Sequence, residues 1–325
     1  LFIFNFNEMK KFIIHVCAFI LFSCAFYITC LLVWGRFAPK TLKPNIRYLQ
    51  GSYGHMSSRL SEVKNYNNID ILFVGSSHAY RGFDTRIFAK NGFRTFNLGS
   101  SSQTPIQTIV LLERYLKSLN PKTIVFEVYP ELFMIDGVES SLDIIANDKN
   151  DFSSLKMAIN LNNIKTYNTL IYGIFQDLLN SNQQFLENNI KGEDKYISGG
   201  FVEKEISYYS PTTYGQKDII LNKNQVDTFS KIISQIKSEN IDLILVFAPV
   251  PRTNFKRFTN PSYFDGLMTT YSDYYNFNNF MTLNDSIHFY DSDHLNQIGV
   301  ELFNNELIKI LKGRETEQKY KNQRD

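Results

Sequence analysis

The chain has 325 residues, of which 20% are charged and 15% aromatic, and its formal net charge at pH 7 is +2. This length allows one large domain or two small ones, and a near-neutral chain without a basic, aromatic-rich patch argues against a nucleic-acid partner. The three cysteines, Cys17, Cys24 and Cys30, all lie in one apolar segment. The remaining sequence therefore holds neither a disulfide framework nor a thiolate metal site.

The first apolar segment predicts a membrane anchor. Residues 12–34 contain no Asp, Glu, Lys or Arg, and their length suits a bilayer crossing of about 20 residues. Lys10 and Lys11 precede the segment, which by the positive-inside tendency places residues 1–11 in the cytoplasm and the rest of the chain outside, in the periplasm or the cell exterior. Residues 1–8 are interpreted as an upstream extension. A cleaved signal peptide has a shorter core of about 7–15 apolar residues, so an uncleaved anchor is favoured.

After a linker at residues 35–56, apolar strands alternate with amphipathic helices, which predicts an α/β domain with a doubly wound parallel sheet over residues 57–313. Residues 136–217 break this pattern and are interpreted as a helical and loop insertion near the site, with helices near 155–159 and 166–180. Residues 314–325 are predicted to be a flexible tail. The core strands are expected at residues 69–74, 94–98, 123–128, 241–247 and 287–290, and the core helices at 57–66, 84–91, 104–119, 222–240 and 297–311.

The domain is organised around residues 69–80, which read IDILFVGSSHAY. A buried strand ends abruptly at Gly75, and Ser76 and Ser77 follow with no polar spacer. Ligands and chemistry in open α/β sheets lie at the carboxyl ends of the strands. Ser77 is therefore a candidate nucleophile, provided that a base and an oxyanion site exist elsewhere in the chain.

His294 is the best candidate for that base. It follows the last predicted strand, and Asp291 lies three residues earlier, a spacing that allows the carboxylate to orient the imidazole. Asp293 is less suitable as the orienting acid, because adjacent side chains diverge, and its alternative interpretation is a helix cap. The backbone amides of Ser77 and Gly99 are the candidate oxyanion donors.

On these residues the chain resembles the SGNH/GDSL hydrolase superfamily. Residues 75–77 (GSS) resemble its nucleophile block, residues 97–99 (NLG) its glycine block, and residues 291–294 (DSDH) its final Asp-x-x-His block. The resemblance covers residues 69–311 apart from the insertion. It implies a flavodoxin-like three-layer α/β/α sandwich and a triad of Ser77, His294 and Asp291.

The sequence departs from the family pattern in two places. Ser76 replaces the usual acid of the first block, and residues 126–130 read FEVYP where a Gly-x-Asn-Asp block is expected. These features are more similar to the acyl-transfer branch, which includes alginate O-acetyltransferase-like proteins and the D-alanyl transfer protein of teichoic acid modification. That resemblance implies a serine esterase or O-acyltransferase without cofactor or metal, acting on cell-surface polysaccharide with an acyl ester donor and a multi-spanning membrane acyltransferase partner.

Two alternatives remain open from the sequence. The missing third block is compatible with a non-catalytic relative that binds glycan or assembles with an acylation or export complex. A soluble lipase-like enzyme with a cleaved first segment is the other.

Four further residues are candidates for substrate contact. His78 either faces the site or packs under the first helix. Glu127 either faces the pocket or pairs with Arg252 or Arg81. Tyr129 and Arg252 follow central strands and complete the set. The Tyr-rich residues 208–214 either stack on sugar rings or pack as an ordinary aromatic loop.

Overall fold

A computed structural model of the chain describes residues 6–51, 53–180 and 185–322. A parallel sheet of five strands forms its centre, in the order β2-β1-β3-β7-β8. Numbered along the core alone, this is the order 2-1-3-4-5 of flavodoxin-like folds, so the predicted fold class is confirmed. The strands are β1 (Ile71–Val74), β2 (Thr95–Asn97), β3 (Thr123–Glu127), β7 (Asp242–Phe247) and β8 (Asp273–Asn276).

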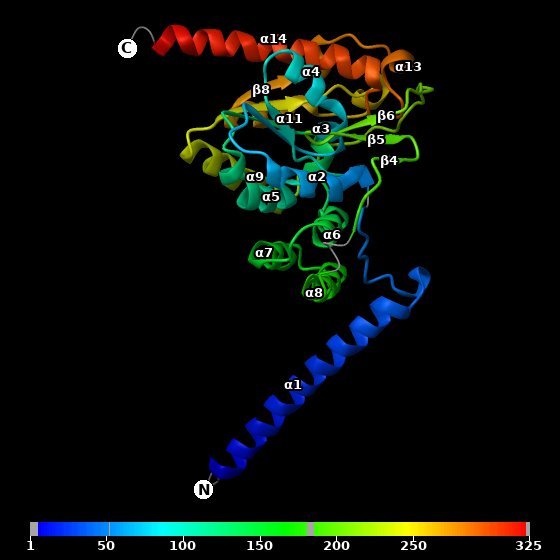
Figure 1. The fold of residues 1–325 in the computed structure, drawn as a ribbon, viewed down its shortest axis with the longest axis vertical. Coiled ribbons are helices and arrows are strands. Elements are labelled where there is room, and N and C mark those ends of the chain that lie inside the picture. The colour runs from blue at the N-terminus through cyan, green and yellow to red at the C-terminus, as the bar shows by residue number, and fades with distance from the viewer. Residues whose placement is uncertain (1–5, 52, 181–184, 323–325) are drawn as a thin grey trace.

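Helices cover both faces of this sheet (Figure 1). Side chains alternate along each strand, so Leu72 and Val74 of β1 enter one core while Ile71 and Phe73 enter the other. The first core lies under α2 (Met56–Glu62), α5 (Pro105–Leu119), α9 (Lys223–Ser238) and α11 (Pro261–Tyr271). The second lies under α3 (Ser77–Gly82), α4 (Thr85–Lys90), α12 (Phe277–Phe280) and α14 (Gln297–Asn322).

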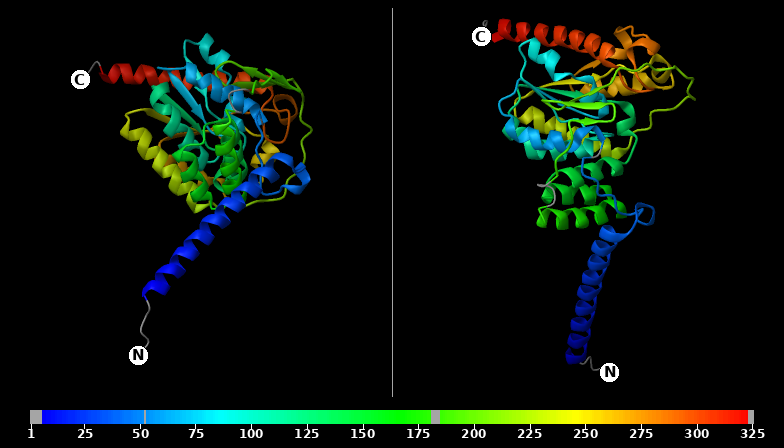
Figure 2. Two further views of the ribbon diagram at one scale, coloured as in Figure 1. Left: turned by 60° about the horizontal axis from the view of Figure 1, so that its bottom comes forward. Right: turned by 45° about the vertical axis from the view of Figure 1, so that its right-hand side comes forward.

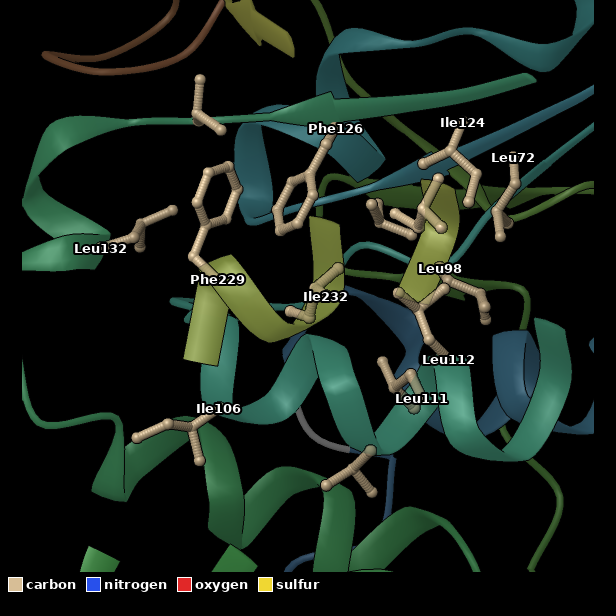
Figure 3. Packing of buried hydrophobic residues seen from close by; sticks show 14 of the residues in the cluster. Leu72, Leu98, Ile106, Leu111, Leu112, Ile124, Phe126, Leu132, Phe229 and Ile232 are labelled. Atoms are coloured by element: carbon tan, nitrogen blue, oxygen red, sulfur yellow. The ribbon is translucent and has the colours of Figure 1, made fainter. Parts of the chain in front are cut away.

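Figure 3 shows the first core, in which Phe126 of β3 faces Phe229 and Ile232 of α9. The two phenyl rings meet edge to face with their centroids 5.2 Å apart. Full burial of a side chain of this size stabilises the fold by about 1.5–3 kcal/mol. This packing holds β3 against α9 and so fixes the position of Glu127 at the carboxyl end of the strand.

Side-chain caps set the helix boundaries close to the predicted ones. Asp84 accepts the amide hydrogen of Arg86 (3.0 Å) and begins α4, and Asn222 does the same for α9 through the amide of Asn224 (2.9 Å). Thr104 begins α5 with a capping box. Each cap satisfies backbone donors that the first turn of a helix leaves free.

The predicted insertion divides into two parts that lie in different places. Helices α6 (Val138–Asn147), α7 (Phe152–Leu161) and α8 (Ile164–Leu178) form an extra layer between the core and α1 (Figure 1). The antiparallel strands β4 (Ile190–Lys191), β5 (Asp194–Ile197) and β6 (Phe201–Lys204) lie beside α3 instead. This second part packs on the helix that carries Ser77.

Helix α1 (Phe6–Phe37) extends away from the domain (Figure 2). It is long and apolar enough to serve as a membrane anchor or a signal sequence. Its domain end packs on α8, where Tyr27 donates a hydrogen bond to Asn168 (2.7 Å) and Leu31 joins Ile46 and Tyr172 in a small apolar cluster. Two short 3-10 helices, Lys40–Leu42 and Tyr53–His55, lie in the linker that follows.

Two boundary predictions are wrong. Residues 287–290 do not form the last strand, because α13 (Asp285–His288) occupies this region, and the fifth strand is β8. Residues 314–322 are not a tail but continue α14, and Arg314 forms ion pairs with Asp242 (2.8 Å) and Asp273. The remaining tail residues, 323–325, and residues 1–5 of the predicted cytoplasmic segment lie outside the described residues.

Candidate active site

The turn from β1 into α3 presents Ser77 at the carboxyl end of the sheet. Gly75 has φ +139°, and a Cβ there would lie 2.7 Å from the Cβ of Glu127, so both the conformation and the space require glycine. Ser76 caps α3 by accepting the amide hydrogen of His78 (3.1 Å). Ser77 is the first residue of the helix, so its own N–H has no acceptor within α3 and is available to a ligand.

The structure brings Ser77, His294 and Asp291 together in the predicted order. His294 Nε2 lies 2.7 Å from Ser77 Oγ, and His294 Nδ1 lies 3.0 Å from Asp291 Oδ2. This is the hydrogen-bonded sequence of nucleophile, base and orienting acid that activates a serine. The arrangement spans 217 positions of sequence between Ser77 and His294.

Local backbone contacts hold the Asp291 carboxylate in place. Its Oδ1 accepts the amide hydrogens of Asp293 (2.8 Å) and His294 (2.7 Å). Partial burial raises the pKa of Asp291, but the hydrogen bond and charge of His294 outweigh burial and hold this pKa below its usual value. The acid is therefore ionised at neutral pH, as an orienting carboxylate needs to be.

Two rings enclose the imidazole of His294. The Tyr290 ring stacks with the His294 imidazole, with ring centroids 5.5 Å apart and ring planes 7° apart. The His78 imidazole also stacks with it, with centroids 5.0 Å apart and planes 24° apart. The His294 side chain keeps 16% of its surface exposed. The ring is thus held by packing while its Nε2 faces the serine.

Beneath the triad lies a buried polar network centred on His78. Its Nδ1 lies 3.1 Å from Ser76 Oγ, and its Nε2 lies 3.0 Å from the backbone oxygen and 3.5 Å from Oδ1 of Asp293. Ser76 in turn donates from both its amide (3.0 Å) and its hydroxyl (2.8 Å) to Glu127 Oε2. The network joins β1, β3 and the loop that carries His294.

The charges in this network depend on one another. Burial disfavours the imidazolium of His78, but the negative charge and hydrogen bonding of Asp293, together with the charge of Glu127, outweigh burial and raise the pKa of His78 to about 9. Burial raises the pKa of Glu127, and the charge of His78 opposes that rise. The pKa of Asp293 is lowered by His78 despite burial. At neutral pH, His78 is therefore a buried cation between acidic side chains.

His78, Glu127 and Tyr129, the candidates for substrate contact, are buried, with exposed fractions of 5%, 1% and 3%. Their contact with a substrate stays a prediction. Among the described residues, Glu127 contacts Ser76 and His78 rather than Arg81 or Arg252. Arg81 binds Asp194 instead (2.8 and 2.7 Å).

Arg252 follows the central strand β7, as predicted, and its contact with a substrate stays a prediction. It begins α10 (Arg252–Phe255) with an exposed side chain, and its amide donates to Asp285 (2.7 Å). The guanidinium that reaches Tyr129 belongs to Arg257 (3.3 Å to the hydroxyl), which also bonds to Glu131 (2.6 Å). The side chain of Tyr129 packs on His78 with ring centroids 4.5 Å apart, at the point in the chain where the missing Asn block was expected.

The Gly99 amide, a predicted oxyanion donor, already has an acceptor in this structure. Its N–H donates to Asn97 Oδ1 (3.0 Å). A Cβ at this position would lie 2.8 Å from both Ala79 Cβ and the backbone oxygen of Ser76. Close packing of the β2 loop on α3 therefore accounts for this glycine.

Sequence reasoning missed the role of Asp293 and the contribution of the β5–β6 hairpin. Asp293 faces His78 and Asn254 (3.1 Å) rather than capping α14, where Asn296 accepts the amide of Gly299 (3.1 Å). Asp194 of β5 holds Arg81, whose guanidinium lies 5.8 Å from the Tyr290 ring. The Asp-x-x-His spacing favoured Asp291 over Asp293. Nothing in the sequence near Asp194 indicates that it contacts a helix more than a hundred residues earlier.

The structure also brings together potential metal ligands that the sequence did not indicate. Ligand atoms of His78, Asp293 and His294 lie within 4.8 Å of one another. Their nitrogens already have hydrogen-bond partners, since His78 Nε2 contacts Asp293 and His294 Nε2 contacts Ser77. As arranged, the three side chains fit a hydrogen-bonded array better than a ligand set.

No family model and no curated protein matches the chain. Solved structures that resemble it include three bacterial proteins. A protein of Bacteroides fragilis described as an acylhydrolase is 10% identical and matches over 81% of this chain and 98% of its own, with a TM-score of 0.40. A GDSL-like lipase of Bacteroides thetaiotaomicron is 9% identical over 80% of this chain and 100% of its own, with a TM-score of 0.39. A Streptococcus pneumonia protein described as a platelet activating factor is 10% identical over 78% of this chain and 93% of its own, with a TM-score of 0.41. Similarity of this degree assigns no activity to the present chain.

We expect Gly99→Ala to destabilise the protein by about 1–3 kcal/mol, because the new methyl group overlaps Ala79 and the Ser76 backbone. Denaturant unfolding of the full chain in mild detergent measures the loss. Gly215→Ala is the matched control, since a Cβ there meets no atom within 4 Å. Equal stability of the two variants would contradict the packing role of Gly99.

The raised pKa of His78 makes part of the stability depend on pH. The folded value of about 9 exceeds the unfolded value of about 6.5, so this contribution is complete below about pH 6.5 and is lost as the pH rises through about 9. We expect the free energy of unfolding to fall more steeply across this window in the wild type than in His78→Asn.

The measurement is urea denaturation at several pH values between 6 and 9.5. His288→Gln serves as the control, because that imidazole accepts only a local bond from the Asn284 amide (2.8 Å) among its described contacts. It is expected to keep the wild-type slope. Parallel pH profiles of the wild type and His78→Asn would show that the buried pair carries no such stability.

Proposed function

We propose that the chain is an SGNH-type serine enzyme that hydrolyses or transfers acyl esters through an acyl-Ser77 intermediate. The observation that supports this most directly is the run of contacts from Ser77 Oγ through His294 to Asp291, at 2.7 and 3.0 Å. Each partner lies at a distance suited to proton transfer or to orientation of the imidazole. The half-buried Ser77 is open enough to meet a substrate.

In the proposed mechanism, Ser77 Oγ attacks the ester carbonyl carbon while His294 Nε2 takes the hydroxyl proton. Asp291 holds the other ring nitrogen and stabilises the imidazolium. The proton then passes to the leaving alcohol as its C–O bond breaks, which leaves the acyl group on Ser77. Water or a sugar hydroxyl attacks this ester, gives its proton to His294 and releases the product, and the proton returns to Ser77 Oγ.

The tetrahedral oxyanion needs donors aimed at it. The Ser77 N–H, at the start of α3, supplies the first. The Gly99 N–H becomes a second donor only if Asn97 turns away from its present bond (3.0 Å). When substrate binds, the Gly99 amide would then donate to the oxyanion in place of Asn97 Oδ1. The proposed mechanism requires this rearrangement for full activity.

The finer proposal is a membrane-anchored enzyme acting outside the cell membrane on polysaccharide, with a multi-spanning acyltransferase as partner and acyl donor. The resemblance to the acyl-transfer branch supports it, as does the packing of α1 on α8, which favours an uncleaved anchor. Tyr208, with 59% of its surface exposed, offers a ring for sugar stacking close to Tyr209 and Tyr214, whose hydroxyls bond at 2.6 Å.

A second candidate function is a non-catalytic glycan-binding or assembly component. The engaged Gly99 amide and the position of Tyr129 in place of the third-block Asn favour it, because both leave the oxyanion with few donors. This candidate predicts glycan binding without labelling of Ser77 by a fluorophosphonate. Labelling of the wild type, absent in Ser77→Ala, favours the enzyme.

We expect Ser77→Ala and His294→Ala to lower p-nitrophenyl acetate turnover by about 10⁴-fold or more, and Asp291→Asn by a smaller factor. Turnover is measured with the full chain in detergent. Ser286→Ala and His288→Gln, at half-buried or exposed positions of α13, are matched controls that are expected to retain activity. Retained turnover in Ser77→Ala would exclude this mechanism, and added oligosaccharide acceptors would separate transfer from hydrolysis.

Orientation in the membrane needs its own measurement. Two basic residues lie before the apolar run, whereas four follow it within 13 positions, and a count of basic residues alone places the domain in the cytoplasm. Those before are Lys10 and Lys11, and those after are Arg36, Lys40, Lys43 and Arg47. The proposed function requires the opposite orientation.

We therefore expect alkaline phosphatase fused after residue 325 to be active, because this enzyme folds only where disulfides form. β-Galactosidase at the same position should be inactive. The reverse pattern would place the domain in the cytoplasm and would remove cell-surface polysaccharide as its substrate.

A further inference from the structure

A cavity of about 580 Å³ lies where the domain meets α1, apart from the triad. The linker after α1, helices α6 and α8, and the loop between β2 and α5 all contribute to its wall. Gly35, near the end of α1, lines it directly. Within the described residues, the linker thus forms a site together with parts of the chain that lie about 50 to 125 positions away.

Charge within this cavity is unbalanced. Four basic side chains line it: Lys40, Lys43, Arg47 and Lys165. Only two acids do so, and both are already paired. Glu139 binds Arg47 and Lys165 (2.8 Å to the latter), and Asp143 lies 3.7 Å from Arg47.

The remaining two lysines carry the excess charge. Lys43 donates to the backbone oxygen of Gly35 (2.8 Å), which is a neutral acceptor, and Lys40 is exposed with no carboxylate partner among the described residues. Hydroxyl groups of Ser101 and Ser102 line the same cavity and can donate to an anion. Together these groups match the oxygens and negative charge of a phosphate ester.

The cavity also lies at the depth of lipid head groups if α1 spans a bilayer. The apolar run ends at Trp34, and exposed Trp34, Phe37 and Leu42 surround the point where the chain leaves the helix. Trp34 donates from its indole to the backbone of Leu42 (3.0 Å). Aromatic rings with a polar handle are enriched at this boundary, and lysines there face the phosphate layer.

We infer that this cavity binds the phosphate head group of an anionic membrane lipid, with Lys40 and Lys43 contacting the phosphate and the acyl chains lying along α1. The lysine and serine side chains of the cavity wall accommodate the head group, and the exposed apolar surface of α1 accommodates the acyl chains. This inference concerns a site separate from Ser77 and stands whether or not the chain transfers acyl groups.

The test uses the full chain in detergent micelles with added phosphatidylglycerol or phosphatidylcholine. Native mass spectrometry measures retained lipid, and thermal unfolding measures the stabilisation that binding gives. We expect phosphatidylglycerol to be retained and to raise Tm, and phosphatidylcholine to do neither. Lys40→Gln/Lys43→Gln should bind phosphatidylglycerol about thirtyfold more weakly, since each lysine contributes roughly fivefold at a lipid surface.

Two controls separate the cavity from general attraction to anionic lipid. Arg36→Gln removes a charge at the same end of α1 but outside the cavity, and Lys231→Gln/Lys237→Gln removes two charges from exposed positions of α9. The α9 double variant should bind like the wild type, and Arg36→Gln should lose less affinity than Lys40→Gln. Lys40→Gln alone, which breaks no described bond, should weaken binding about fivefold and keeps the test valid if the double variant unfolds.

Glycerol 1-phosphate distinguishes the source of the anion. Failure of this soluble phosphate to compete would assign the site to a lipid, and competition would assign it to a phosphate from solution and overturn the lipid. Equal binding of the two lipids by the wild type, or an equal loss in Arg36→Gln and Lys40→Gln, would overturn the cavity as an anion site.

Discussion

The bond between the Ser76 hydroxyl and Glu127 Oε2 (2.8 Å) holds the candidate site together. It joins the ends of two neighbouring parallel strands, β1 and β3, at the point where the chain turns into α3. His78 continues the connection from the same turn to the backbone of Asp293 (3.0 Å). Three segments from distant parts of the sequence are thereby fixed before any substrate binds, and this fixes Ser77 relative to His294.

This network gives a physical account of the first departure from the family pattern. Where the resemblance leads one to expect an acid after Gly75, the chain has Ser76, and the acid comes from the adjacent strand as Glu127. A carboxylate on β3 accepts two bonds from Ser76 and faces the His78 cation at 3.8 Å. A buried charge is tolerated only when paired in this way, so Ser76, His78 and Glu127 are expected to vary together rather than singly.

The sequence predicted those features that depend on local chemistry. Continuous apolar runs placed β1, β3 and β7, because strands buried on both faces leave no room for polar side chains. The three-residue spacing of Asp291 and His294 placed the carboxylate where it accepts the His294 amide. By contrast, β8 reads DYYN and lacks such a run, since an edge strand is only partly buried.

Features that depend on contacts between distant residues could not be predicted from the sequence. Nothing near Glu127 distinguishes Ser76 from Arg81 as its partner, because the choice follows from the register of β1 on β3 and from Asp194 binding Arg81. The hydrogen bond that engages the Gly99 amide could not be predicted either. A glycine that permits close packing and one that exposes its amide look identical in sequence, and only the bond to Asn97 separates them.

The two parts of the insertion contribute to two different sites in the molecule. Helix α8 packs on α1, and α6 and α8 together complete the cationic cavity. The β5–β6 hairpin instead supplies Asp194 to Arg81, beside Tyr290 and His294. The loop after β2 takes part in both regions, since Ser100 donates to the Gly75 backbone (3.2 Å) while Ser101 and Ser102 line the cavity. The loop after β2 thus connects the wall of the cavity with the turn that presents Ser77, so the two sites share one structural element.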